Sequence, residues 1–464
     1  MSELILGFLI IAFAFTGLAI GLIFKDQPIK GSCGGMANLD SSGECQICGR
    51  TDPQSCNDWF LLLMINGHCD DRFKKIHEIF SEQLISGHEL GCSVAIEYEG
   101  NEVVNLYGGY TNKLKSKVWT DDTLVNVWSV TKAVTGICIS KIISDGLLDV
   151  NKNVDFYWPE YGKTKSDTKV IDVLTHRAGM FGFKDGFPDC NWTDWDTFVK
   201  TLESQTPYHE PGISQGYHAL TFAWLVGEIF RRAEGRMVGD YFRDEIASPY
   251  NLDFHIGLPN YEHYRCADIS FKRFDNLKPP LEFIKYIPDI FLFNDLKNLK
   301  KSIISKDFTY AFNGELFNRY DPNSSDWRMS QVPSANGHGT AASLAKLFGI
   351  LVTGCERDGI KLLDFTTLKD ATTIKTSGPD SVLFGSKINF GYCFMLNGNE
   401  RNRVNFAPLM KKNTFGHAGI GGAVAFGDLD KKIGYSFVCN KQQKPANLYK
   451  TSNLLTEALY KILD

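Results

Sequence analysis

Serine and lysine occur three times in this sequence at the spacing S-x-x-K, which places a hydroxyl and an amine on one face of a helix. Side chains at this spacing lie about 5–6 Å apart at Cβ, and a neutral amine beside a hydroxyl makes an activated nucleophile. The spacing alone does not identify a catalytic pair. The three pairs are Ser129–Lys132, Ser166–Lys169 and Ser343–Lys346.

The surroundings of these pairs favour the first one. After Lys132 comes AVTGICISKII, a helix with small or apolar residues nearly all round, which indicates burial. Burial and the positive helix N-terminus both disfavour an ammonium group, so we expect a lowered pKa for Lys132. Ser166 lies in a polar stretch with nothing to desolvate its lysine. Ser343 begins an amphipathic helix, whose serine and lysine we expect at a solvated edge.

Two further segments contain residue types that suit acyl transfer. Tyr217 stands just before an apolar helix in GYHALTFAWLVGEIFRRAEG, where a tyrosine is more often a core residue than a catalyst. His417 stands in TFGHAGIGGAVAF, before glycines that lead into a strand. Glycines there allow a substrate to approach the strand edge, and backbone N–H groups of that strand can face an oxyanion. Alone, such a histidine is most often structural.

The elements that must position these residues come from both chain ends. Asp70 opens a helix with Phe73, Ile76, Phe80 and Leu84 on one face, and a hairpin, SVAIEY and EVVNLY, follows it. Residues 421–440 form a second hairpin, and SNLLTEALYKIL forms a last helix. The sequence therefore predicts an α+β fold: an antiparallel sheet built from both chain ends, with a mainly helical region inserted between them. We expect the site in the cleft between sheet and helices.

One segment of the middle region is unusual. Residues 277–304, LKPPLEFIKYIPDIFLFNDLKNLKKSII, are aromatic and interrupted by prolines, so they cannot form one long helix. We expect the segment to pack on the core. The alternative is a lid or a membrane-facing flap over the cleft.

The N-terminal segment predicts a membrane anchor at residues 1–30. Residues 4–24, LILGFLIIAFAFTGLAIGLIF, carry no charge, and about 20 apolar residues suffice to cross a bilayer as a helix. A cleaved signal peptide is the alternative, but its apolar region is shorter, at about 7–15 residues, after a basic start. Here the start carries Glu3 and no basic residue. We therefore expect a single-pass transmembrane helix.

Cysteines crowd the segment that follows, residues 31–69. Cys45 and Cys48 form half of a zinc motif, but no second half follows at suitable spacing. Disulfides in an oxidising compartment are the favoured interpretation. The sequons at Asn191 and Asn323 agree with a glycosylated body on the lumenal or extracellular side. The cysteines of this segment are Cys33, Cys45, Cys48, Cys56 and Cys69.

Composition sets limits on the partners. The 464 residues have a formal net charge of −5, whereas a nucleic-acid-binding protein usually shows a basic patch. We therefore expect no nucleic-acid partner. We also expect no metal and no cofactor.

Taken in chain order, S-x-x-K, a tyrosine motif and H-x-G resemble the serine β-lactamase-like hydrolases. That family includes class C β-lactamases, D-alanyl carboxypeptidases and esterases of the β-lactamase fold. The strings WTDDTLVNVWSVTK, VIDVLTHRAGM, GYHALTFAWLVGEI and PSANGHGTAASLAKLF extend the resemblance over residues 70–464. It implies a β-lactamase/transpeptidase-like fold for this hydrolase domain.

The resemblance also implies residue roles. Ser129 would be the acyl-accepting nucleophile, Lys132 its base, and Tyr217 the group that moves the proton to the leaving group and later activates water. His417 stands where β-lactamases carry the lysine of K-T-G. The oxyanion would be bound by backbone N–H groups of Ser129 and of the strand end at Gly419 and Ile420.

Two departures argue against lactam hydrolysis. Tyr217-His-Ala219 replaces Y-x-N, and the lysine of K-T-G is absent. The favoured interpretation is a membrane-anchored serine hydrolase that forms an acyl-enzyme with a small ester or amide. One alternative is a catalytically weak, membrane-tethered scaffold. Another is a peptidase acting on D-amino-acid or small peptide ends, for which a protonated His417 or Arg177 would bind the substrate carboxylate.

Overall fold

The computed structural model describes residues 65–270, 282–312, 321–396, 413–443 and 447–464. The expected transmembrane helix at 4–24 and four of the five clustered cysteines lie outside these ranges. Within them, no helix combines the length and the apolar character that crossing a membrane requires. The fifth cysteine, Cys69, is a free thiol.

An antiparallel sheet joins the two ends of the chain, as predicted. In the described ranges it has nine strands in the order β1-β3-β2-β14-β13-β12-β11-β10-β9, and every neighbouring pair is antiparallel. The N-terminal and C-terminal parts meet where β2 pairs with β14, with Val94 opposite Phe437. The strands are β1 (Asn66–Cys69), β2 (Gly91–Tyr98), β3 (Asn101–Gly109), β9 (Thr376–Pro379), β10 (Lys387–Phe390), β11 (Met395–Leu396), β12 (Thr414–Ala418), β13 (Val424–Asp428) and β14 (Ile433–Cys439).

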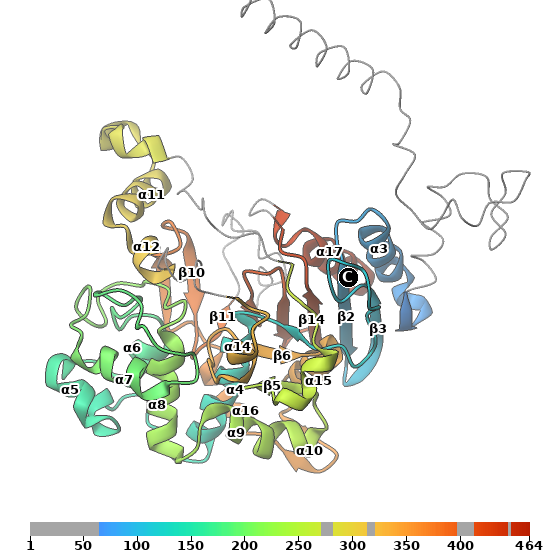
Figure 1. Ribbon diagram of the computed structural model, residues 1–464, viewed down its shortest axis with the longest axis horizontal. Helices are drawn as coiled ribbons and strands as arrows, with labels where there is room; N and C mark the ends of the chain where they lie inside the picture. Colours follow the sequence, from blue (N-terminus) through green and yellow to red (C-terminus); the bar gives the residue numbers. More distant parts are fainter. Residues whose placement is uncertain (1–64, 271–281, 313–320, 397–412, 444–446) are drawn as a thin grey trace, which may run out of the picture. The chain divides into compact units, whose positions relative to one another are not determined.

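Helices cover both faces of this sheet (Figure 1). Because side chains alternate along a strand, Val94 joins an apolar cluster with α3 (Lys74–Ile85) and α17 (Lys450–Leu463), whereas Ala95 joins the cluster that contains α15 (Ala341–Val352). α15 lies so close to β14 that a Cβ on Gly434 would come within 2.2 Å of a helix carbonyl. The predicted face of α3 is buried in full.

The region between the two halves of the sheet is mainly helical, also as predicted. Two small sheets complete it, one of β4 (Val125–Asn126), β6 (Gly337–Gly339) and β5 (Phe254–Ile256), the other of β7 (Glu356–Arg357) and β8 (Ile360–Lys361). Its helices are α4 (Val130–Ser144), α5 (Pro159–Lys165), α6 (Val170–Leu174), α7 (Trp195–Ser204), α8 (Phe222–Glu234), α9 (Val238–Phe242), α10 (Ser248–Tyr250), α11 (Asn294–Ser305), α12 (Asp307–Phe312), α14 (Ser325–Met329) and α16 (Phe365–Ala371). The shorter helical turns are η2 (Asp71–Phe73), η3 (Val154–Phe156), η4 (Arg243–Ala247), η5 (Asn260–Arg265), η6 (Glu282–Tyr286) and η7 (Asp289–Phe291).

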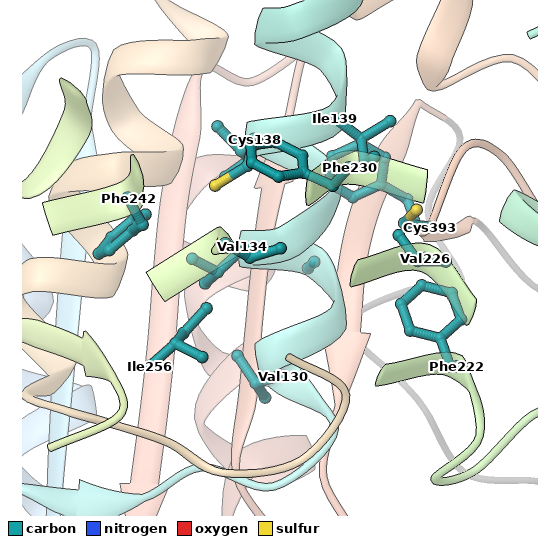
Figure 2. Close-up of a cluster of buried hydrophobic side chains, with 14 of the residues drawn as sticks. Val130, Val134, Cys138, Ile139, Phe222, Val226, Phe230, Phe242, Ile256 and Cys393 are labelled. Atoms are coloured by element: carbon teal, nitrogen blue, oxygen red, sulfur yellow. The ribbon is translucent and has the colours of Figure 1, made fainter. Parts of the chain in front are cut away.

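Helix α4 runs through the centre of the molecule and is buried on nearly every side. Figure 2 shows its side chains between the aromatic rings of α8 on one side and Phe242 of α9 and Ile256 of β5 on the other. Val130, Val134 and Cys138 are fully buried there, as is Phe222 of α8. An apolar helix surrounded by packed side chains has little freedom to move, so residues in its first turn are held in place.

We expected residues 277–304 to pack on the main core, but the described part of this segment does not do so. Its η6, η7 and α11 enclose a separate small apolar cluster. Ile287 and Pro288 separate η6 from η7. Phe384 packs against this cluster from the body of the molecule, and a Cβ on Gly385 would lie 2.7 Å from the backbone of Asn298. In Figure 1, α11 stands away from the sheet.

Candidate active site

The turn that presents Ser129 has an unusual backbone. Trp128 adopts φ +53°, a left-handed conformation that is rare for a bulky residue and is found mainly where the surroundings enforce it. Ser129 then occupies the N-cap position of α4, and its side chain makes no capping hydrogen bond. The serine is thus held at the end of a rigid helix and forms part of the wall of a pocket.

Lys132 is fully buried one turn into the same helix, and its amine has three close oxygen neighbours. Nζ lies 2.8 Å from the carbonyl of Ala219, 2.9 Å from that of Ser334 and 3.3 Å from Ser129 Oγ. A neutral amine has two N–H donors and one lone pair. The two carbonyls can only accept hydrogen bonds, so a neutral Lys132 directs its lone pair to the hydroxyl of Ser129.

Burial favours this neutral form. Loss of solvation places the pKa of Lys132 well below its ordinary value, as predicted from the apolar helix. Burial also raises the pKa of Tyr217, although its hydrogen bond with Ser129 partly opposes the change. Lys132 is therefore ready to accept a proton, and Tyr217 keeps a proton that it can donate.

Tyr217 lies beside both members of the pair. Its hydroxyl is hydrogen-bonded to Ser129, and its ring centre is 4.9 Å from Lys132 Nζ. The predicted residues Ser129, Lys132 and Tyr217 are therefore brought together. Hydroxyl, amine and phenol form one short path along which a proton can pass.

Asp380 is a neighbour of this group that no sequence motif singles out. Its fully buried carboxylate accepts hydrogen bonds from the backbone N–H of Tyr217 at 3.1 Å and from those of Val382 and Leu383 at 3.0 and 2.9 Å. Burial raises its pKa to about 6. Since Leu383 lines the pocket, Asp380 ties the tyrosine segment to the pocket wall.

The histidines around the site are buried and neutral. Burial lowers the pKa of His417 to about 3, with a further contribution from Lys132. Its Nδ1 donates to the carbonyl of Ala418 at 2.8 Å, and its ring centre lies 6.0 Å from that of Tyr217. His218, in the middle of the altered Y-x-N motif, is also buried, and its ring bonds to Met180 and Gly216. It therefore does not replace the missing asparagine in the pocket.

The glycine run after His417 serves mainly to accommodate Trp128. A Cβ on Gly419 would lie 2.5 Å from the carbonyl of Val127, and one on Gly421 would lie 2.3 Å from Trp128 Nε1. We expected these glycines to give a substrate access to the strand edge, but the nucleophile turn itself occupies that space.

The same loop narrows the choice of oxyanion donors. The N–H of Gly419 already donates to the carbonyl of Ala423 at 2.7 Å. Among the described residues, the N–H groups of Ser129 and Ile420 donate to no backbone acceptor. Because both residues line the pocket, their N–H groups are the better candidates for binding an oxyanion. The N–H of Gly419 stabilises the loop instead.

A pocket of about 130 Å³ opens beside Ser129. No charged side chain is among the residues that line it, and most of its surface is aliphatic or aromatic. Such a lining suits an apolar group of a substrate. The lining residues are Trp128, Ser129, Trp192, Tyr217, Ala219, Leu220, Phe312, Trp327, Ala335, Leu383, Met395, Ala418, Ile420 and Tyr449.

The two other S-x-x-K serines lie in different surroundings. Ser166 is exposed after α5. Ser343 is not at a solvated edge, contrary to our expectation: it is 8% exposed, and its Oγ accepts hydrogen bonds from the N–H of Asp253 at 2.7 Å and from the hydroxyl of Thr340 at 3.0 Å. Its hydroxyl therefore holds two segments together.

Two further sequence-derived candidates are engaged elsewhere. Arg177 bonds to the carbonyl of Gly212, lies 4.0 Å from Asp172 and is absent from the pocket lining. Asn323, in the second sequon, is half-buried and exchanges two hydrogen bonds with the backbone of Ile269. Asn191 of the first sequon is exposed.

Comparisons with known proteins agree with this geometry. The family model described as Beta-lactamase matches residues 76–458. A second model, described as (Na+)-NQR maturation NqrM, matches residues 22–60, outside the described residues. The protein named esterase/beta-lactamase LipL, from Mycobacterium tuberculosis, is 26% identical over 391 residues, which are 82% of this chain and 83% of that protein.

Solved structures show the same architecture. A penicillin-binding protein homolog from Caulobacter crescentus is 34% identical, with a TM-score of 0.72 over 86% of this chain and 99% of its own. A family VIII carboxylesterase is 28% identical, with a TM-score of 0.71 over the same shares.

Fold and side-chain set thus define a serine hydrolase with the β-lactamase/transpeptidase-like architecture. The matched region spans most of the chain, so the protein belongs to the beta-lactamase family.

Proposed function

We propose that this protein is a serine esterase that forms an acyl-enzyme on Ser129 with esters of an apolar acid. One observation carries the proposal: the buried amine of Lys132 gives two hydrogen bonds to carbonyls and has its third position at Ser129 Oγ. General base catalysis of this kind is worth about 10²–10⁴ in rate.

The proposed acylation begins when Ser129 Oγ attacks the ester carbonyl carbon and its proton passes to Lys132. The N–H groups of Ser129 and Ile420 bind the oxyanion. Removal of one such donor from an enzyme typically costs about 10²–10³ in rate. Tyr217 then protonates the leaving alkoxide and regains a proton from Lys132. The alcohol departs and Ser129 carries the acyl group.

Deacylation uses the same groups in reverse order. Tyr217 gives its hydroxyl proton to Lys132 and takes one from a water molecule, and the water oxygen attacks the acyl carbon. When the tetrahedral intermediate collapses, Ser129 Oγ recovers a proton from the ammonium of Lys132 and the carboxylic acid leaves. Lys132 and Tyr217 return to their neutral forms, so the cycle needs no cofactor.

The apolar pocket favours an ester over the alternative substrates. A peptidase that acts at a free carboxyl end needs a cation in the pocket, but His417 is neutral with a pKa of about 3 and Arg177 lies elsewhere. The names of the relatives, esterase/beta-lactamase and carboxylesterase, point the same way. The D-amino acid amidase structures, at 17–18% identity, show the fold alone.

The test is an acyl-transfer assay on the full chain and on Ser129→Ala, with Ser343→Ala as the matched control. A short-chain activated ester is supplied, turnover is followed, and the intact mass is recorded during the reaction. We expect turnover and an acyl adduct in the wild type and in Ser343→Ala, and neither in Ser129→Ala. Activity that survives Ser129→Ala would reject the nucleophile. A folded wild type that shows neither would favour the scaffold.

We also propose that residues 4–24 anchor the protein as a single-pass helix, with the hydrolase body on the lumenal or extracellular side. The support is the uncharged length of this segment and the cysteine-rich stretch that follows it. Protease added to sealed vesicles from an expressing cell, in which the lumen is enclosed, should leave the body intact. Degradation before the vesicles are opened would reverse the orientation.

A further inference from the structure

Exposed apolar side chains are concentrated in one part of the molecule. Of the seventeen large apolar side chains that are exposed in the described ranges, six lie between residues 283 and 304. Such a concentration marks an interaction surface more often than scattered single residues do. We name residues 283–306 the α11 projection. The six exposed side chains are Phe283 (60%), Tyr286 (80%), Ile290 (84%), Phe291 (74%), Phe293 (80%) and Ile304 (58%).

The projection is a built structure, and its exposed rings are not left over from a poorly packed loop. Ile284, Leu292, Leu299 and Ile303 bury themselves against one another and form its interior. Lys300 closes the turn after η6 with bonds of 2.7 Å to Asp289 and to the carbonyl of Ile287. The apolar residues thus divide into an enclosed set and a second set turned outward.

The charge of the projection differs from that of the whole chain. Residues 283–306 contain five lysines and two aspartates, although the protein carries a net charge of −5. Lys301 and Lys306 are exposed on α11 and directly after it. Aromatic and aliphatic tips bordered by lysines are the composition of segments that lie in the interface of an anionic bilayer.

The base of the projection reaches the candidate active site. Phe308 of α12 stacks on Phe384 with ring centres 4.6 Å apart. Phe312, at the end of the same helix, and Leu383, next to Phe384, both line the pocket. The exposed surface and the pocket are therefore connected by two short segments, residues 307–312 and 383–385.

We propose that the α11 projection docks on the surface of an anionic lipid bilayer, with the six exposed apolar side chains entering the headgroup region and Lys297, Lys301 and Lys306 contacting lipid phosphates or carboxylates. The surface is separate from the predicted anchor at 4–24. It brings the pocket mouth to the bilayer, from which apolar esters can enter. This last step rests on the proposed esterase activity, whereas the docking does not.

The experiment uses the full chain and a local probe, because an inserted anchor would bind any vesicle by itself. A polarity-sensitive dye is attached through a bioorthogonal residue in place of Ile290, and in a matched protein in place of Leu114, which is 87% exposed and lies outside the projection. Each protein is placed in phosphatidylcholine bilayers with and without phosphatidylserine. A lipid-free sample is held in amphipol.

We expect the dye at position 290 to shift to the blue in bilayers, more strongly with phosphatidylserine, and the dye at position 114 to stay unchanged. The double substitution Lys297→Glu and Lys301→Glu should remove the additional shift. No shift at position 290, or equal shifts at both positions, would overturn the proposal. Emission at position 290 that is the same in amphipol and in both bilayers would also overturn it, because the bilayer would then add no apolar environment.

A second readout separates docking from catalysis. Phe291→Asp with Phe293→Asp is compared with Leu114→Asp with Ile213→Asp, two pairs of exposed side chains with the same change of charge. We expect the first pair to lower turnover of a bilayer-embedded long-chain ester about tenfold, as weakened interfacial binding would, and to leave a soluble short-chain ester unaffected. Equal losses with both esters would reject the link to the pocket. If no ester is turned over at all, the dye experiment still tests the docking.

Discussion

Helices α4 and α15 each have a serine and a lysine three residues apart near the N-terminal end, yet only the first pair forms a candidate site. Ser129 faces a pocket, and its lysine reaches back to it at 3.3 Å. The hydroxyl of Ser343 instead accepts hydrogen bonds from Asp253 and Thr340. Lys346 points away and donates to the carbonyl of Tyr250 at 2.8 Å.

The difference between the two helices lies in what their hydroxyl and amine are used for. The spacing is the same in both, but burial is not: Lys132 and Ser343 are buried, whereas Ser129 and Lys346 are only partly buried. Spacing alone therefore does not separate a nucleophile from a structural serine. In α15 the polar atoms satisfy the backbone of neighbouring segments, which stabilises the fold. In α4 the amine is satisfied by two carbonyls and the hydroxyl remains available to the pocket.

Removal of the lysine amine should give the largest difference in activity between the two helices. We expect Lys132→Met to lower kcat/KM for a soluble ester by about 10²–10⁴, since the base is lost, and Lys346→Met to leave it within a small factor. Stopped-assay kinetics on both variants provide the comparison. Similar losses in the two variants would mean that the contrast between α4 and α15 is not catalytic.

The pH dependence of the activity should follow the amine of Lys132. Its pKa is lowered by burial, and only the neutral amine can accept the proton of Ser129. We therefore expect kcat/KM to rise with pH while Lys132 loses its proton, to level off well below the ordinary lysine range, and to be lost on acidification. The rising limb should persist in Asp380→Asn, whose replaced carboxyl has a pKa of about 6. A limb that disappears in this variant belongs to Asp380.

Asp380→Asn should have an intermediate effect on catalysis. The amide oxygen can keep the Oδ1 position that accepts from Tyr217, Val382 and Leu383, but the amide nitrogen then faces Nε2 of Gln215, another donor, and the carboxyl group is lost. Tyr217 is therefore held less firmly. We expect kcat to fall about tenfold to a hundredfold, a typical result of misplacing a catalytic group, with KM little changed. Glu97→Gln, at a buried carboxylate paired with Arg357 outside the pocket, is the control. A change confined to KM would exclude a positioning role.

The same substitution should change how stability depends on pH. The pKa of Asp380 is raised from 3.8 to about 6 in the folded protein. Between these values the folded state holds a proton that the unfolded state has released, so the free energy of unfolding falls as pH rises through this window. Denaturant unfolding at several pH values should show this fall in the wild type and a smaller one in Asp380→Asn.

Truncation of the pocket wall should have a smaller effect, limited to substrate choice. Phe312→Ala removes a ring from the wall beside Ser129, and loss of apolar contact lowers the transition-state affinity for larger acyl groups. We expect kcat/KM to fall about threefold to tenfold for long acyl esters and to stay the same for acetyl esters. Equal losses for both lengths would place the acyl group elsewhere.

Ser343→Ala should affect stability alone. The N–H of Asp253 would lose its acceptor in a partly buried position, which costs at most about 1–3 kcal/mol, whereas turnover should not change. Ser129→Ala should show the opposite pattern. Thermal unfolding and ester turnover measured on both variants test this prediction. A Ser343→Ala variant that unfolds like the wild type would contradict the structural role of Ser343.

The sequence predicted the sheet, the central helix and the three residues that meet at the site. These features depend on local patterns: alternation in strands, an apolar helix, and motif order. Asp380 could not be predicted, because a carboxylate 163 residues from Tyr217 along the chain carries no local sign of the contact. The contacts of Ala219 and Ser334 with Lys132 could not be predicted either, because they are made by backbone carbonyls, which every residue type has.

Other predictions failed for a different reason. Ser343 was expected at a solvated edge because the helix pattern counts serine as polar, but hydrogen bonds can place a serine inside a core. The segment at 277–304 has apolar residues in excess of what one face can bury, so the sequence alone does not say which of them turn inward. Sequence hydropathy predicts that such residues exist, and three-dimensional packing decides where they lie.

The contact between Trp128 and the glycine run separates two kinds of information in this sequence. Any side chain at position 419 or 421 would collide with the backbone or the ring of the turn before Ser129, whether or not the serine reacts. A relative that kept this turn but lost its nucleophile would still require glycine at both places. The glycine run is therefore a marker of the architecture, and Ser129, Lys132 and Tyr217 together are the marker of activity when related sequences are sorted into enzymes and inactive proteins.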